Sequence, residues 1–102
     1  MLMKPFKERC YEKLMKVPKG KVTTYRELAH ALGTLAYRAV GSAMATNQNA
    51  PKVPCHRVVN SDGKIGNYSL GGKKAKIELL TKEGIKIKDE KVVDLDKVLY
   101  KF

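Results

Sequence analysis

Apolar residues recur along the first part of the chain with the spacing of an amphipathic helix. Phe6, Cys10, Leu14 and Val17 follow one another at steps of three or four residues, which predicts one buried stripe. The proline and glycine in residues 18–20 interrupt this pattern and end the helix.

A second helix is predicted directly after this break. Residues 22–23 form a short extended link, and Thr24 followed by Glu27 has the spacing of a capping box. The helix therefore begins at Tyr25, and Gly33 closes it.

A third apolar-periodic segment covers residues 35–46, so a short helix, a tight turn and another helix predict a helix-turn-helix. Small residues crowd this third helix: Ala39, Gly41, Ser42, Ala43 and Ala45. They allow its backbone to lie very close to another surface, which is either the protein core or a DNA groove. Arg38 at the start of the helix favours the groove.

The second half of the chain predicts shorter elements. Residues 53–59 are expected to be extended, residues 60–63 to form a turn and residues 66–69 a loop. A helix is predicted over residues 72–84 and a short strand with a turn over residues 85–93. The tail beyond them has no clear pattern.

Length and charge narrow the class of protein. A chain of 102 residues has room for one domain with one modest core. No apolar run approaches the roughly 18 residues of a membrane span, and the start is too interrupted for a signal peptide. We therefore expect a cytoplasmic protein, or a nuclear one in a eukaryote, that does not bind membranes.

The net charge of +11 is unevenly distributed. No carboxylate occurs between Glu27 and Asp62, although Arg38, Lys52 and Arg57 lie there. This pattern is typical of a protein with a polyanionic partner such as nucleic acid. The alternative is a soluble protein that is simply rich in lysine.

The two cysteines are not expected to form a disulfide in a reducing compartment. Cys10 lies on the apolar stripe and is most simply a small buried hydrophobe. Cys10, Cys55, His30 and His56 are too few and too irregularly spaced for a metal site, so we predict no metal.

Cys55 is the candidate nucleophile. A thiol reacts as its thiolate, and a neighbouring base or positive charge increases the ionised fraction. His56 and Arg57 follow Cys55 directly and supply both. The alternative is that His56 is an ordinary core histidine.

Four short motifs carry a resemblance to a known family. They are residues 38–41 (RAVG), 54–59 (PCHRVV), 66–69 (GNYS) and 83–84 (EG). In order and spacing the chain resembles the C-terminal, active-site domain of O6-alkylguanine-DNA alkyltransferases, the methylated-DNA–protein-cysteine methyltransferases. The match runs from Tyr11 to Gly84, with one extra residue near residues 70–72.

The resemblance implies a mainly α fold with a few short strands and a winged-helix-like helix-turn-helix that binds DNA. Only about ten residues precede the first matching helix. We therefore expect residues 1–102 to form a single active-site domain without the N-terminal domain that many relatives carry.

The resemblance also implies a reaction. Cys55 attacks the alkyl carbon on guanine O6 in DNA and retains it as a thioether, so each molecule acts once and needs no cofactor. His56 takes the thiol proton through a bridging water, because adjacent side chains of an extended segment point to opposite sides. Glu83 orients and charges the imidazole, and Asn47 pins the loop between the recognition helix and the active site.

A base inside a duplex must leave the stack before a buried thiol can reach it. By resemblance, Arg38 fills the gap from a helix lying in the minor groove. Ala39, Gly41 and Ser42 let that helix approach, and Tyr25 helps to rotate the nucleotide and donates to guanine N3. The implied partner is double-stranded DNA with O6-alkylguanine, bound by a monomer. Alternatively, Arg38 is a solvated surface residue and Tyr25 packs on the core.

The remaining pocket residues follow from the same resemblance. Tyr68 and Ser69 match a lid, in which the Ser69 amide binds guanine O6, and the Val58 carbonyl accepts from the exocyclic amine. Ala50 and Pro51 depart from some relatives, and their loop walls the pocket that receives the alkyl group.

Two other functions compete with repair. Alkyltransferase-like proteins bind lesions without chemistry, but they usually replace the reactive cysteine, often by Trp, whereas this chain has no Trp and keeps Cys55. A transcription regulator would use the helix-turn-helix in the major groove with sequence preference. That reading leaves the pair of Cys55 and His56 unexplained.

Overall fold

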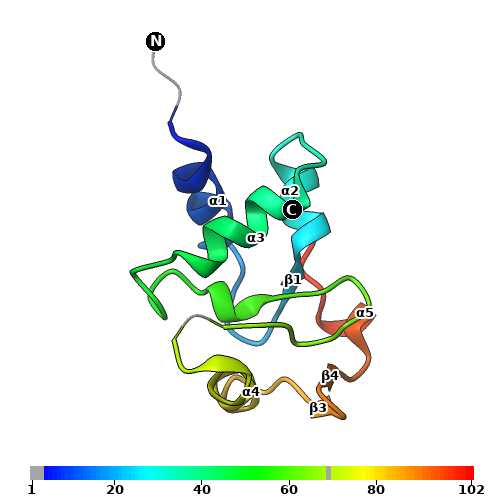
Figure 1. Ribbon diagram of the computed structural model, residues 1–102. Helices are drawn as coiled ribbons and strands as arrows, with labels where there is room; N and C mark the ends of the chain where they lie inside the picture. Colours follow the sequence, from blue (N-terminus) through cyan, green and yellow to red (C-terminus); the bar gives the residue numbers. More distant parts are fainter. Residues whose placement is uncertain (1–3, 69) are drawn as a thin grey trace.

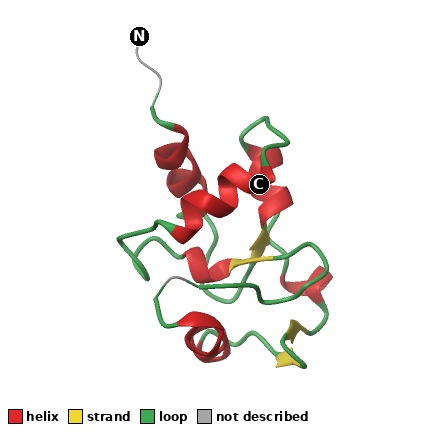
Figure 2. Ribbon diagram, in the orientation of Figure 1, coloured by secondary structure: helices red, strands yellow, loops and turns green. Residues whose placement is uncertain are grey.

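Helices carry most of the regular structure in the computed structural model, which describes residues 4–68 and 70–102 (Figures 1 and 2). The elements in chain order are α1 (Phe6–Leu14), β1 (Thr23–Thr24), α2 (Tyr25–Ala31), α3 (Tyr37–Ala45), the 3₁₀ turn η1 (Cys55–Arg57), β2 (Val58–Val59), α4 (Gly72–Lys82), β3 (Ile87–Lys88), β4 (Lys91–Val92) and α5 (Leu95–Val98). The predicted class, mainly α with a few short strands, is confirmed.

The first three helices pack against one another and form the upper part of the molecule (Figure 1). Cys10 and Leu14 of α1 are fully buried there, and Val17 follows them into the core from the turn after the helix. The Glu27 N–H donates to Thr24 Oγ1 at 3.0 Å, which provides the N-cap of α2. The predicted start of α2 at Tyr25 is therefore confirmed. The first helix ends at Leu14, before the predicted break at residues 18–20, and Phe6 at the start of its apolar stripe is only partly buried.

The helix α3 begins at Tyr37, two residues later than the pattern predicts. The Ala36 N–H donates to Thr34 Oγ1 at 3.1 Å, so a side-chain turn holds the backbone before the helix starts. Ala43 is buried, whereas Ala39 and Ser42 are exposed. The small residues of α3 thus serve both the core and the open surface.

A parallel pair of strands holds the centre of the fold together. In β1 and β2, Thr23 pairs with Val58 and Thr24 with Val59. Val58 packs in the core with residues of α1, α2 and α3, while Val59 packs in a second core with residues of α4 and of the antiparallel pair β3 and β4. Adjacent strand residues point to opposite faces, so β2 separates the two cores and anchors the turn η1 between them.

The prediction that residues 53–59 are extended is wrong for Cys55–Arg57. The Arg57 N–H donates to the Pro54 carbonyl at 2.9 Å and closes a 3₁₀ turn there. Pro54 is the residue that precedes this turn, and only Val58 and Val59 remain extended. The side chains of Cys55 and His56 therefore leave a turn, not a strand.

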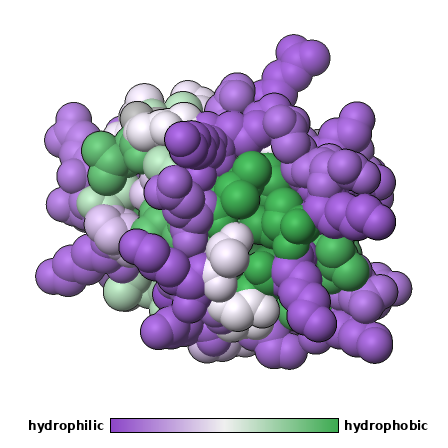
Figure 3. Space-filling model, turned by 90° about the horizontal axis from the view of Figure 1, so that it is seen from below, coloured by the Kyte–Doolittle hydropathy of each residue, from purple (hydrophilic) through white to green (hydrophobic). Residues whose placement is uncertain are grey.

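The helix α4 and the hairpin β3–β4 form the lower part of the molecule. Seen from below, this face has an apolar area surrounded by hydrophilic side chains (Figure 3). The tail, which has no clear sequence pattern, returns to the centre of the fold. The Val22 N–H donates to the Val98 carbonyl at 2.9 Å, and the Tyr100 N–H donates to the Val22 carbonyl at 2.7 Å.

Candidate active site

The thiol of Cys55 lies on the wall of a cavity of about 410 Å³, which we call the inner pocket. Cys55 is 4% exposed. Residues from five parts of the chain line the inner pocket: Tyr25, Gly41, Met44, Ala45, Cys55, Asn60, Gly66, Asn67 and Tyr68. A nucleophile at the wall of such a cavity is buried from bulk water but open to a ligand that enters it.

The imidazole of His56 is tied to a carboxylate 27 residues away in sequence. His56 Nε2 lies 3.1 Å from Glu83 Oε2, at the C-terminal end of α4. Glu83 also receives a two-pronged contact from Arg57, with Nε to Oε1 at 2.9 Å and Nη2 to Oε2 at 2.7 Å. A third hydrogen bond, from Arg57 Nη1 to the Val17 carbonyl at 2.8 Å, holds the guanidinium group in this orientation. Arg57 therefore orients Glu83.

Charge and burial set the protonation of this pair. Burial alone would raise the pKa of Glu83, but hydrogen bonds from Arg57 and His56 lower it, so the carboxylate is ionised. Burial lowers the pKa of His56, and the hydrogen bond and charge of Glu83 only partly oppose this. The imidazole is therefore neutral around pH 7.

An ionised carboxylate only accepts hydrogen bonds. His56 must therefore carry its proton on Nε2 and present a free lone pair on Nδ1. Nδ1 is buried and has no hydrogen-bond partner among the described residues. The site thus contains a neutral base, with its basic nitrogen unengaged, in the same 3₁₀ turn as the thiol.

Two phenols line the inner pocket with the thiol. Burial raises the pKa of Tyr25, and the charge of a Cys55 thiolate raises it further. The same two causes, in the same order, raise the pKa of Tyr68. Both phenols stay protonated near neutrality and can donate a hydrogen bond. The Tyr68 hydroxyl is buried and has no partner within the described part of the chain.

Lys76 is a site residue that the sequence analysis missed. It is fully buried in α4, and its Nζ donates to the Asn67 carbonyl at 3.3 Å, in the loop that lines the inner pocket. Burial lowers the pKa of Lys76 to about 8, although a Cys55 thiolate would raise it. Lys76 stands four residues before the buried Leu80, so helical periodicity placed it on the inward face.

Four of the predicted DNA-contacting residues lie together on α3, whereas the fifth, Tyr25, begins α2. Arg38, Ala39 and Ser42 are exposed, while Gly41 is half-buried and lines the inner pocket. The opposite face of α3 carries Val40, Ala43 and Met44 into the core. The exposed face of this helix therefore adjoins the opening of the thiol cavity.

The remaining predicted site residues lie outside the inner pocket lining or outside the described part of the chain. Asn47 Nδ2 donates to the Val53 carbonyl at 2.8 Å, and Asn47 Oδ1 accepts from the Asn49 N–H at 2.9 Å, so this side chain spans the loop before η1. Val58 is buried in β2, and the role of its carbonyl stays a prediction. Ser69 lies outside the described residues.

Within residues 4–68 and 70–102, no group of three or more His, Cys, Asp or Glu side chains could hold a metal ion. In the same part of the chain, no helix has both the length and the apolar character needed to cross a membrane.

Comparison with known proteins gives concordant matches. The family model described as "6-O-methylguanine DNA methyltransferase, DNA binding domain" matches residues 5–85. A methylated-DNA--protein-cysteine methyltransferase of Saccharolobus solfataricus is 47% identical over 83 residues, covering 81% of this chain and 53% of the relative. The chain spans about half the length of such curated relatives.

Two solved structures extend the comparison. The O6-methylguanine-DNA methyltransferase of Pyrococcus kodakaraensis is 49% identical, with a TM-score of 0.73 over 81% of this chain and 48% of that one. Atl1 of S. pombe, in complex with damaged DNA containing O6-carboxymethylguanine, is 31% identical. Its TM-score is 0.86, with complete coverage of both chains (100% each).

Proposed function

The chain belongs to the family of 6-O-methylguanine DNA methyltransferase DNA-binding domains, and on that premise we propose that it repairs DNA by moving an alkyl group from guanine O6 to Cys55. Transfer forms a bond between Sγ and the alkyl carbon and breaks the bond between that carbon and O6. The electron pair of the broken bond stays on the purine. The thiol loses one proton and the restored guanine gains one, so the reaction balances without a cofactor.

The observation that carries this proposal is the unengaged Nδ1 of His56. Its Nε2 is committed to Glu83, and Nδ1 is buried in the same turn as Cys55 without a hydrogen-bond partner among the described residues. A neutral imidazole in this state can take the thiol proton, directly or through one water, as general bases do in other triads. Glu83 then stabilises the resulting imidazolium.

The inner pocket supports entry of a single extruded base. Its volume of about 410 Å³ falls in the range of roughly 300–1,000 Å³ typical of small-molecule sites. Tyr25 and Tyr68 provide protonated hydroxyls that can donate to a purine, since burial raises the pKa of each. Donors of this kind offset the negative charge that develops on the departing guanine.

The exposed face of α3 supports binding in the minor groove. That groove is only about 6 Å wide, which suits a helix surface with small side chains such as Ala39 and Ser42. Arg38 lies on the same surface and would occupy the space that the extruded guanine leaves. The partner is then double-stranded DNA containing O6-alkylguanine, bound by one protein molecule.

Intact-mass analysis tests the proposal. The protein is incubated with a duplex containing O6-methylguanine and then weighed. Repair predicts one added methyl group, which disappears in Cys55→Ala and persists in Cys10→Ala, the matched control at a buried cysteine of α1. An unmodified wild-type protein that had met excess lesion would contradict the proposal.

A second candidate function is recognition of the lesion without transfer. It is favoured by the overlay on Atl1, which extends over the whole of both chains with a TM-score of 0.86. Under this function the protein would bind the O6-methylguanine duplex more tightly than an undamaged one but gain no mass. The presence of Cys55 beside an unengaged base favours transfer.

A further inference from the structure

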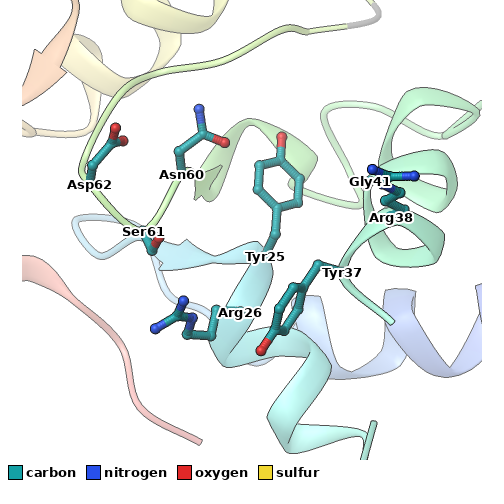
Figure 4. Close-up of a pocket in the computed structure, with 8 residues that line it drawn as sticks. All are labelled: Tyr25, Arg26, Tyr37, Arg38, Gly41, Asn60, Ser61 and Asp62. Carbon is teal, nitrogen blue, oxygen red and sulfur yellow. The ribbon is translucent and has the colours of Figure 1, made fainter. Parts of the chain in front are cut away.

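A second cavity, of about 450 Å³, adjoins the inner pocket. We call it the outer pocket (Figure 4). The residues that matter for its chemistry are Tyr25, Arg26, Tyr37, Arg38, Gly41 and Asn60. It contains neither the thiol nor the imidazole, and the proposed transfer gives no role to Arg26, Tyr37 or Asn60, which line it.

The two cavities share a wall. Tyr25, Gly41 and Asn60 line both of them. A nucleotide whose base enters the inner pocket remains attached to its strand, so its sugar and the adjoining phosphate must lie at the opening. The shared wall therefore brings the outer pocket next to the strand that carries the extruded nucleotide.

The outer pocket is positively charged at two points. Arg26 and Arg38 both line it, and neither forms an ion pair with any described residue. The one acidic lining residue, Asp62, accepts a hydrogen bond from the Lys64 N–H at 3.0 Å and faces Lys64 Nζ at 3.9 Å. Its charge is thus engaged within its own turn, and the pocket favours an anion.

An aromatic ring contacts one of these guanidinium groups. Arg26 Cζ lies 5.9 Å from the centroid of the Tyr37 ring, within the range of a cation–π contact. The Tyr37 hydroxyl lies 3.4 Å from Nε2 of His30, which belongs to α2 like Arg26. In the view of Figure 4, Arg26 lies on the opposite side of Tyr25 from Arg38. The two arginines can therefore serve different parts of one DNA strand.

We propose that the outer pocket holds the backbone phosphate next to the extruded nucleotide, with Arg26 as its ligand and Tyr37 as the residue that orients Arg26. The planar guanidinium matches a phosphate with two parallel N–H donors. Arg38 then remains free to fill the gap in the duplex. This proposal rests on the proposed function only in that a nucleotide leaves the helix.

The test removes the protein charge and the phosphate charge separately and together. Binding is measured with Cys55→Ala protein, which cannot transfer an alkyl group, on duplexes containing O6-methylguanine. One phosphate at a time beside the lesion is replaced by an uncharged methylphosphonate. This double-mutant cycle compares the protein that keeps Arg26 with the Arg26→Ala variant on each duplex. If Arg26 contacts a phosphate, the loss of affinity on removing both groups differs from the sum of the two single losses.

On the unmodified duplex we expect Arg26→Ala to weaken binding about tenfold and to reduce the slope of log affinity against log salt by about 1. On the duplex with the matching methylphosphonate, Arg26→Ala should weaken binding no further. Tyr37→Ala should reproduce part of the loss, and Tyr37→Phe, which keeps the ring, should not. Lys88→Ala, which removes an exposed charge on β3, is the control and should show no coupling to these phosphates.

Equal losses for Arg26→Ala on all duplexes, or coupling only to phosphates distant from the lesion, would overturn the proposal. The outcome is separable from the proposed transfer, because binding and mass are measured independently. If the coupling is found and wild-type Cys55 gains no methyl group, transfer is wrong and the phosphate site remains. If Cys55 is methylated and no coupling is found, only the phosphate site is wrong.

Discussion

Replacing Lys76 by Met should stabilise the protein at pH 7. Lys76 is fully buried, and its pKa falls from the ordinary value of 10.5 to about 8 because of burial, against the opposing effect of a Cys55 thiolate. Each pKa unit corresponds to about 1.4 kcal/mol, so the charged ammonium costs the folded state about 3 kcal/mol. Met has a similar length and needs no charge in the core.

The substitution also removes the 3.3 Å hydrogen bond to the Asn67 carbonyl, which is worth about 1 kcal/mol. A net gain of about 2 kcal/mol remains, equivalent to roughly 10 °C in Tm for a domain of this size. Lys74→Met, at an exposed position of the same helix, should change Tm little.

The pH dependence gives the sharper test. Below pH 8, Lys76 is protonated in both the folded and the unfolded protein, so its cost is constant. Between pH 8 and 10.5 the unfolded chain binds more protons, so wild-type stability rises with pH relative to the Met variant. Urea unfolding of both proteins at several pH values measures this difference. A Met variant that is less stable at pH 7, or a gain that does not change with pH, would refute the reasoning.

Three further predictions concern the site. Arg38→Ala should slow repair of duplex DNA about tenfold or more, because unstacking the guanine costs a few kcal/mol. The same variant should slow the reaction with free O6-methylguanine less. Single-turnover rates on both substrates measure the difference. Gly41→Ala should leave the protein folded, since a Cβ there meets no atom within 4 Å, but narrow the opening of both pockets and weaken binding to lesion DNA in a titration. Glu83→Gln should slow transfer about 100-fold or more. Because hydrogen bonds depress the pKa of Glu83 in the folded protein, wild-type stability should fall as pH drops below about 4.5, and acid unfolding of Glu83→Gln should lack this contribution.

The sequence pattern predicted those helices that are determined by interactions between residues three or four positions apart. The stripe of Cys10 and Leu14 identified α1, and Thr24 with Glu27 located the start of α2, because periodicity and capping act over three or four residues. The same rules missed η1: they predicted residues 53–59 to be extended, whereas the three residues after Pro54 form a 3₁₀ turn. They also missed the tail, whose structure depends on pairing with Val22.

The site was less accessible to sequence reasoning than the fold. Its central contact joins Arg57 and Glu83 across 26 residues of chain, and no spacing rule predicts such a pair. Glu83 entered through the resemblance, whereas the role of Arg57 as its partner emerged only from the structure. Lys76 could have been found from its helical phase with Leu80, but a lysine in so basic a chain gives no other signal.

A titration of protein against lesion tests the central claim most directly. Limiting protein is added to excess O6-methylguanine duplex, restored guanine is counted after digestion, and the modified peptide is located by mass spectrometry. The account predicts one guanine restored per protein molecule, then no further reaction, with the methyl group on Cys55. Restoration of many guanines per molecule, or a methyl group on any other residue, would contradict it.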